Sequence, residues 1–244
     1  RTTDHDMTTD IFIRTCAKDT AWLQFAVKSI RERVTGYRDL VITCPRAAVE
    51  KVKRTTGHHV IGVAPFHDDY VGQQHTKLKA TDHSDADVIC FWDSDTVAAE
   101  PVDLNDLLFS GGRLIVHHVP FDGLADGSEV WRKTMTKTMG SVPDFEFMRR
   151  LPLAYYRSTL LGCVQHIERT HGMPLSTYMK RVPQRQFTEF NCIGMWAYEH
   201  ERGLYDFRID EGEAAEWKRR VRQFWSWGGI TPEVVEELHK LGLA

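Results

Sequence analysis

Apolar strand-like segments alternate with helix-patterned segments through the first half of this 244-residue chain. The strand-like segments are rich in Ile, Val and Phe, whereas between them apolar side chains recur roughly every three to four positions. Such alternation predicts a mostly parallel sheet with helices on both faces. We expect strands near residues 11–16, 40–42, 60–63, 88–93 and 113–116, and helices over 22–34, 47–54 and 72–81.

Beyond residue 120 the alternation stops and helical spacing dominates. Thr231 is placed to cap the last helix, since a hydroxyl there can accept a bond from a first-turn amide. We therefore expect an α/β fold, with a Rossmann-like, mostly parallel sheet flanked by helices over residues 7–120. Residues 121–244 are expected to form a helical lobe of the same domain, with helices over 155–170, 189–202 and 232–241.

Composition limits the classes of function. Hydrophobic residues make up 42% of the chain, and no apolar stretch approaches the roughly 20 residues that cross a bilayer, so we expect no transmembrane segment. The net charge of -3 gives no general attraction to nucleic acid. Five widely spaced cysteines without a Cys-x-x-Cys pair fit reduced thiols in a cytoplasmic protein. A viral origin, with an intracellular location in the host, would suit so compact a chain.

Two carboxylates one residue apart, Asp93 and Asp95, follow the apolar segment 88–92. Side chains at i and i+2 share one face of an extended segment, so both can point at one cation where the strand ends. Mg²⁺ and Mn²⁺ prefer oxygen ligands and often keep positions open for substrate phosphates. The alternative is an acidic turn after a buried strand. Ligands of parallel sheets bind beyond the carboxyl ends of strands, which favours the metal site.

This layout resembles the GT-A glycosyltransferases, whose Asp-x-Asp after a central strand holds the metal that bridges a nucleotide-diphosphate donor. The resemblance covers residues 10–120. Gln73, Gln74 and Lys77 are similar to a Gln-Gln-x-x-Lys-Leu helix in a microbial and viral branch of these enzymes. That branch also carries a Ser/Thr-Glu-aromatic segment, matched here by residues 188–190.

The resemblance implies a metal-dependent glycosyltransferase that moves a hexosyl or pentosyl group from a nucleotide diphosphate, with UDP expected, to a hydroxyl. Mn²⁺ or Mg²⁺ is the implied cofactor, held by Asp93 and Asp95. The implied acceptor is a glycan or a lipid-linked saccharide, with a modified nucleic-acid base as the less favoured choice. The donor-binding residues that we expect are Thr15, Cys16, Lys18, Gln73, Gln74, Lys77, Trp92, Asp93, Ser94 and Asp95.

Lys77 lies one helical turn from Gln73 and Gln74, so all three can share one side of a helix. An ammonium that faces diphosphate is a familiar use of lysine, and a solvated helix face is the alternative.

Glu189 is the candidate base, because an inverting transfer needs a carboxylate near the acceptor hydroxyl, and Asp210 is the substitute. A structural role for Glu189 stays open, since an acid suits the first turn of a helix that Thr188 could cap. Related enzymes often take a further metal ligand, commonly histidine, from late in the chain. Residues 225–226 stand about there, and His200, Asp210 and His239 are possible substitutes.

Two other functions remain open. Residues 93–97 also match the opening motif of haloacid-dehalogenase-like phosphatases, in which the first aspartate is a nucleophile and the second a general acid. That motif normally follows the first strand of its domain, whereas three strand–helix units precede it here. A non-catalytic carbohydrate-binding protein on a decayed transferase fold is the other alternative. The aromatic segment 223–229 could stack on sugars, although packing of the C-terminal lobe onto the sheet is favoured.

Overall fold

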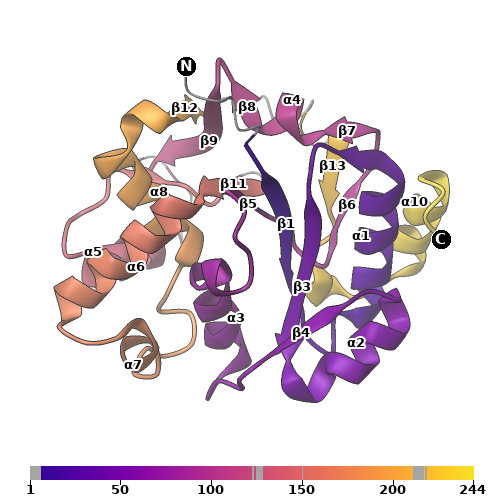
Figure 1. Ribbon diagram of the computed structural model, residues 1–244, viewed down its shortest axis with the longest axis horizontal. Coiled ribbons are helices and arrows are strands. Elements are labelled where there is room, and N and C mark those ends of the chain that lie inside the picture. Colours follow the sequence, from indigo (N-terminus) through magenta and orange to yellow (C-terminus); the bar gives the residue numbers. More distant parts are fainter. Residues whose placement is uncertain (1–6, 123, 125–128, 150, 211–216, 218) are drawn as a thin grey trace.

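The computed structural model describes residues 7–122, 124, 129–149, 151–210, 217 and 219–244. Its central sheet has the strand order β11-β5-β1-β3-β4 (Figure 1). Four of these strands are parallel and β11 is antiparallel to β5. The predicted α/β class with a mostly parallel sheet is therefore confirmed. The strands are β1 (Thr9–Arg14), β3 (Asp39–Pro45), β4 (Val60–Val63), β5 (Val88–Phe91) and β11 (Leu153–Tyr156).

Helices cover both faces of this sheet, which explains why every residue of β1 and β5 is buried. Helices α1 (Thr20–Arg33) and α2 (Val49–Thr56) lie on one side, and α3 (Asp69–Leu78), α6 (Arg157–His171) and α8 (Glu189–His200) on the other (Figure 1). Further helices in the described part of the chain are α4 (Leu104–Leu108), α5 (Glu129–Met139), α7 (Leu175–Met179) and α10 (Pro232–Lys240). Short 3-10 turns are η1 (Arg46–Ala48), η2 (Ala80–Asp82), η3 (Arg202–Leu204) and η4 (Ser226–Gly228).

The second half of the chain is less purely helical than the sequence predicts. It supplies β11 to the central sheet, and β10 (Phe145–Glu146) and β12 (Tyr205–Ile209) flank β9 (Arg113–Pro120) in a separate sheet. The predicted fifth strand near 113–116 therefore exists as β9, but outside the central sheet. Pattern alone could not make this assignment, because it marks a strand without naming its partner. Strand β8 (Phe109–Ser110) also pairs with β9, and the small pairs are β2 (Val34–Thr35) with β7 (Val102–Asp103) and β6 (Thr96–Ala98) with β13 (Val221–Gln223).

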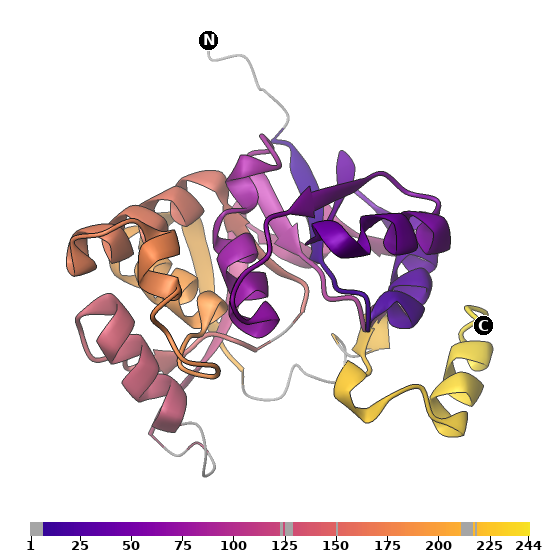
Figure 2. The same ribbon diagram turned by 90° about the horizontal axis from the view of Figure 1, so that it is seen from below.

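The C-terminal helix α10 lies on the α1 side of the molecule (Figure 2). Lys28 of α1 donates to the carbonyl oxygen of Gly242 at 3.1 Å. Thr231 caps α10 as predicted, since its hydroxyl accepts from the amide of Val234 at 3.4 Å. The C-terminal segment is thus docked on α1 rather than on the helices α5 to α8.

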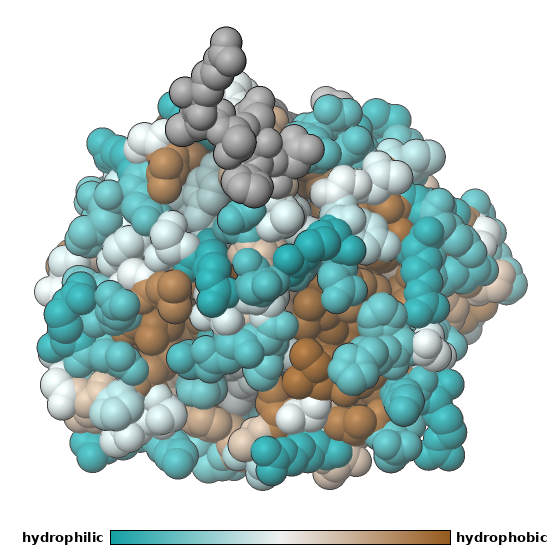
Figure 3. Space-filling model, in the orientation of Figure 1, coloured by the Kyte–Doolittle hydropathy of each residue, from teal (hydrophilic) through white to brown (hydrophobic). Residues whose placement is uncertain are grey.

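Among the described residues, no helix combines the length and the apolar character that a membrane crossing requires. On the face seen in Figure 1, apolar residues reach the surface in separate patches between hydrophilic ones (Figure 3). All five cysteines are free, and four of them are buried.

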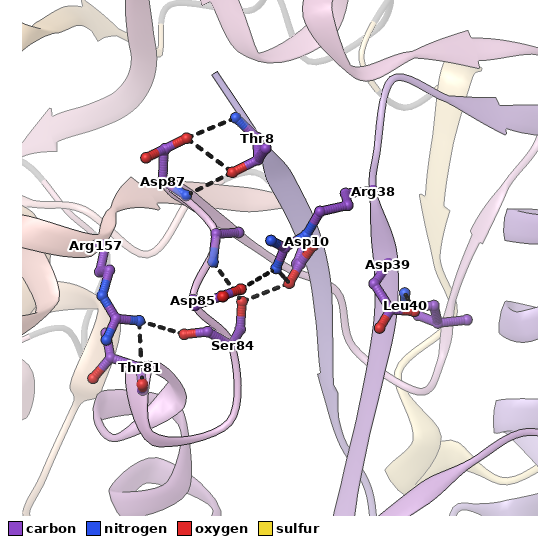
Figure 4. Close-up of polar contacts among 11 residues, drawn as sticks. Thr8, Asp10, Arg38, Asp39, Leu40, Thr81, Ser84, Asp85, Asp87 and Arg157 are labelled. Carbon is purple, nitrogen blue, oxygen red and sulfur yellow. Dashed lines mark hydrogen bonds and ion pairs between the residues drawn. The ribbon is translucent and has the colours of Figure 1, made fainter. Parts of the chain in front are cut away.

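A buried ionic network closes the amino-terminal edge of the central sheet (Figure 4). Asp10, whose side chain is 1% exposed, accepts from Arg38 Nε at 2.9 Å and Nη2 at 2.7 Å. Ser84 Oγ donates to the same carboxylate at 2.6 Å. Arg38 also reaches the exposed Asp85 at 2.6 Å. The network ties β1 to the start of β3 and to the loop before β5, at the edge opposite Asp93.

Asp10→Asn should lower the free energy of unfolding by about 1.5 to 3 kcal/mol, because it removes the buried carboxylate charge that the half-exposed Arg38 guanidinium pairs with through two hydrogen bonds. Urea denaturation measures this loss. Asp85→Asn is the matched control, since an exposed partner of the same arginine contributes only about 0 to 1 kcal/mol. Equal effects of the two substitutions would contradict a structural role for the buried network.

Candidate functional site

Asp93 and Asp95 lie in a tight turn that follows β5. The amide of Thr96 donates to the carbonyl oxygen of Asp93 at 3.1 Å and closes the turn. The predicted extended geometry is therefore wrong, because the chain reverses immediately to enter β6. Trp92 is completely buried, and its indole N–H donates to the carbonyl oxygen of Thr96 at 2.7 Å. The indole thus braces the turn from the inside.

The turn sits at the carboxyl edge of the parallel strands. The amide of Trp92 donates to the carbonyl oxygen of Phe12 in β1 at 3.0 Å, so the segments that follow β1 and β5 leave the sheet side by side. Open α/β sheets bind ligands at this edge. The position therefore suits a binding site, as the sequence predicts.

Lys77 connects two of the predicted site residues. Its ammonium lies 3.0 Å from Asp93 Oδ1 and 3.2 Å from Glu189 Oε1. It also lies 4.6 Å from the centre of the Phe190 ring, in a cation–π arrangement. The lysine and glutamate side chains are 7% and 5% exposed. Residues far apart in the sequence are thus joined in one buried ion-pair cluster.

Burial lowers the pKa of Lys77, but the two carboxylates more than offset that penalty. The net effect is a raised pKa, so the ammonium stays charged throughout the neutral range. The helix face is therefore not solvated. Sequence reasoning placed Lys77 opposite diphosphate, whereas here its partners are the protein's own carboxylates.

Glu189 begins α8, whose first turn points at the C-terminal end of α3. Thr188 occupies the N-cap position, yet its side chain accepts no bond from a helix amide. Its hydroxyl instead accepts from the side-chain amide of Asn191 at 2.9 Å. The side-chain cap that the structural alternative for Glu189 included is therefore absent. Glu189 is positioned by its ion pair with Lys77 as well as by the helix terminus.

Asp95 is 8% exposed, and its two carboxylate oxygens differ in their hydrogen bonding. Oδ2 accepts from the amide of Ser226 at 2.6 Å, and the Asp95 carbonyl oxygen accepts from the amide of Phe224 at 2.9 Å. Oδ1 is buried and has no hydrogen bond of ordinary geometry among the described residues, although the side chain of Gln223 lies close enough to lower the pKa of this carboxyl. Burial, together with the charge of Asp93, raises the pKa of Asp95. A cation at Oδ1 would relieve both penalties.

The carboxylates of Asp93 and Asp95 suit a hard divalent ion that completes its coordination shell with substrate oxygens. No group of three or more His, Cys, Asp or Glu side chains within the described part of the chain is arranged to hold a metal by itself. Mg²⁺ characteristically binds through one or two carboxylates and completes its shell with phosphate and water. The pair Asp93 and Asp95 supplies those carboxylates. The orphaned Oδ1 of Asp95 is the atom that most needs such a partner.

The segment expected to supply a late ligand does reach the site. Residues 224–226 contact Asp95 through two backbone amides. The other candidates lie elsewhere: His239 is on α10, and His200 ends α8, stacked 5.0 Å from the ring of Trp196. Asp210 follows β12 in the separate sheet, where its amide donates to the carbonyl oxygen of His118 at 2.9 Å.

The loop after β1 holds the three residues expected to receive the nucleotide. Thr15 is buried, its amide donates to the carbonyl oxygen of Thr43 at 2.9 Å, and its hydroxyl has no partner among the described residues. Cys16 is half-buried, and burial raises the pKa of its thiol. Lys18 is exposed. Exposure to solvent therefore increases along this loop from Thr15 to Lys18.

Arg14 was missed by sequence reasoning. It ends β1, is 6% exposed and forms an ion pair with Asp69 in the first turn of α3. Its guanidinium also donates to the carbonyl oxygen of Thr15 at 2.9 Å. The available signal was an arginine directly after the apolar run 11–13. Arg14 ties the loop that follows β1 to the first turn of α3.

Gln74 and Gln73 differ in exposure. Gln74 is buried and donates to the carbonyl oxygen of Phe187 at 2.9 Å, which ties α3 to the segment before α8. Its Oε1 has no hydrogen-bond partner within the described chain. Gln73 is only half-buried, and Ser94, in the Asp93–Thr96 turn, is buried.

No protein-family model matches this sequence, and a comparison with curated proteins finds no significant match.

Proposed function

We propose that this protein is a metal-dependent glycosyltransferase that uses a nucleotide-diphosphate sugar, with UDP as the favoured nucleotide. The observation that carries the proposal is the Asp93–Thr96 turn at the carboxyl edge of the sheet, with an orphaned Asp95 oxygen and a buried Lys77 that links Asp93 to Glu189. A paired carboxylate turn offers an anionic receptor for a divalent ion. Glu189 adds a second carboxylate within reach of the same lysine.

In the proposed reaction, the acceptor hydroxyl oxygen bonds to the anomeric carbon of the donor while the bond from that carbon to the diphosphate oxygen breaks. The diphosphate leaves with the electron pair. Glu189 takes the proton of the hydroxyl, which makes the oxygen a better nucleophile. A divalent ion held by Asp93 and Asp95 would neutralise the leaving diphosphate.

Lys77 has a positioning role in this scheme. Its ammonium pairs with the carboxylates of both Asp93 and Glu189, so one shared cation holds the metal-side acid and the proposed base. Preorganisation of charged groups is the main route by which a site favours charge development in a transition state. Phe190 is also buried, and its ring lies 4.6 Å from the same ammonium.

Calorimetric titration of UDP with and without Mn²⁺ tests the donor site. We expect binding that depends on Mn²⁺ and that Asp95→Asn weakens by at least about tenfold, because a charged contact contributes roughly 1.5 to 3 kcal/mol. Asp85→Asn, at the opposite edge of the sheet, should leave the affinity unchanged. UDP binding whose affinity does not depend on Mn²⁺, or is unchanged by Asp95→Asn, would refute the proposal.

The same Asp95→Asn variant should be more thermally stable than the parent protein without metal at neutral pH. The folded-state pKa of Asp95 is raised, so its ionised form destabilises the fold above the ordinary value of 3.8. That penalty is absent below the ordinary value and grows as pH rises towards the folded-state pKa. The melting temperature of the variant should therefore exceed that of the parent by a margin that grows from acid to neutral pH. A variant less stable than the parent at neutral pH would indicate a structural aspartate.

A screen of nucleotide sugars for Mn²⁺-dependent hydrolysis identifies the donor. Release of UDP by the parent chain, lost in Asp95→Asn, is the expected result. Release of inorganic phosphate from phosphomonoesters instead would favour the phosphatase alternative. Carbohydrate binding without any turnover would favour the non-catalytic one.

A further inference from the structure

Two tryptophans beside the candidate metal site are exposed. Trp225 is 58% exposed and Trp227 is 86% exposed, whereas Trp22 and Trp92 are buried. Tryptophan is on average a highly buried residue, because its large apolar surface disfavours contact with water. Exposure of two indoles within three residues is therefore a feature that packing does not explain. It contradicts the sequence expectation that these aromatics pack the C-terminal lobe onto the sheet.

The backbone around these indoles is held firmly. Trp225 has φ of 59°, in the left-handed region that a residue with a side chain rarely adopts. The amides of Gly228 and Gly229 donate to the carbonyl oxygens of Trp225 and Ser226, each at 3.0 Å. Backbone strain that surrounding contacts maintain is characteristic of functional positions. The turn therefore presents both side chains in a defined place.

That place is next to Asp95. The amides of Phe224 and Ser226, which flank Trp225, bind the Asp95 carbonyl oxygen at 2.9 Å and Oδ2 at 2.6 Å. Phe224 is the one aromatic of this segment that packs inwards, with its ring 5.8 Å from that of Trp22. Strand β13 continues the attachment by pairing with β6. Trp225 thus lies between two residues whose amides bind Asp95, and Trp227 follows two positions later.

The charges around the turn argue for a neutral ligand. Three of the cations close to the turn in sequence are paired with acids: Arg219 with Glu100 at 2.8 Å, Arg222 with Glu237, and Lys240 with Glu236 at 2.7 Å. Arg220 is a further cation of this segment, whereas Asp93 and Asp95 add negative charge beside the turn. Proteins that stack single-stranded nucleic acid on aromatic side chains line the path with several unneutralised basic residues. A neutral ligand with an apolar face, such as a sugar ring, therefore suits this turn better than a polyanion.

We propose that Trp225 and Trp227 form a stacking platform for a neutral saccharide, which is the acceptor class of this enzyme. The inference rests on the proposed function, since it takes the Asp93–Thr96 turn as the donor side of the same site. Stacking of a pyranose ring on an indole leaves the hydroxyls at the edge of the ring free to react. The platform selects by ring shape rather than by charge.

Titration of the 244-residue chain with neutral hexasaccharides (maltohexaose, cellohexaose, chitohexaose and mannohexaose) in the presence of UDP and Mn²⁺ tests the platform. Indole N–H resonances are assigned by comparison with Trp225→Phe and Trp227→Phe. At least one saccharide should shift both resonances. Trp227→Ala should lower the affinity for that saccharide about tenfold. Trp227→Phe should lower it less, because the phenyl ring keeps part of the stacking surface. Val142→Ala, which alters another exposed apolar residue, is the matched control and should change nothing.

Several results would overturn the platform. These are failure of every saccharide to bind, binding that both tryptophan substitutions leave unchanged, or tighter, salt-dependent binding of a 20-nucleotide single strand. A dimer in gel filtration that Trp227→Ala dissolves would assign the indoles to self-association instead. UDP binding measured in the same samples separates the two proposals. Intact Mn²⁺-dependent UDP binding without saccharide binding would retain the transferase and reject the platform, and the reverse would retain only a carbohydrate-binding surface.

Discussion

Replacing Lys77 with methionine should lower the free energy of unfolding by about 3 to 5 kcal/mol, the usual cost of breaking a buried ion pair by removal of one partner. Asp93 and Glu189 would then face each other without the ammonium that lies 3.0 and 3.2 Å from them. Chemical denaturation with urea measures the loss. A double variant, Lys77→Met with Glu189→Gln, should recover part of it, because fewer buried charges remain uncompensated.

The effect should not depend on pH between about 7 and 9. A raised lysine pKa means that the stabilisation by Lys77 is fully present below the ordinary value of 10.5 and disappears only as pH passes the folded-state pKa. Lys79→Met is the matched control, since Lys79 pairs with the exposed Asp82 at 3.2 Å and such a pair contributes about 0 to 1 kcal/mol. A similar loss in both variants would show that the cluster has no special energetic role.

Glu189→Gln should reduce the rate of UDP release in the Mn²⁺-dependent hydrolysis of the best donor by on the order of 10² or more, because the amide cannot accept the proton of the attacking oxygen. Glutamine retains an oxygen that can accept from Lys77, so the fold and the Asp93 contact should persist. Initial rates at saturating donor, together with UDP affinity by calorimetry, separate loss of basicity from loss of binding.

Glu199→Gln provides the control for this measurement, because Glu199 is exposed on the same helix. Near-normal turnover in Glu189→Gln would remove Glu189 from the catalytic residues. A large fall in thermal stability without a specific loss of rate would make Glu189 a structural partner of Lys77 only.

The local parts of the fold could be predicted from the sequence. The helix over 22–34 appears as α1, the strand before Asp93 as β5, and Thr231 caps α10. These features depend on periodicity, burial of apolar runs and capping chemistry, which a short stretch of chain already contains. The alternation of the first half also predicted parallel strands, because short right-handed crossovers leave few other arrangements.

Pairing across long distances could not be predicted in the same way. The pattern at 113–116 marks a strand, yet only packing decides that it joins β12 and not the central sheet. Likewise, β11 closes the sheet beside β5 from a segment that reads as the start of a helix. A strand pattern specifies which face of the strand is apolar, but it does not determine which other strand will pair with it.

For the candidate site, the sequence by itself determined that two carboxylates, Asp93 and Asp95, follow a buried strand and that Lys77 and Glu189 belong to separate helices. Tertiary structure alone decided that Lys77 faces Asp93 and Glu189, and that the backbone of Phe224 and Ser226 covers Asp95 while Trp225 and Trp227 stay exposed. The physical reason is that burial and charge pairing depend on which segments pack together. Residues 77, 93, 189 and 226 acquire their electrostatic environment only when the helices and the C-terminal segment meet at the edge of the sheet.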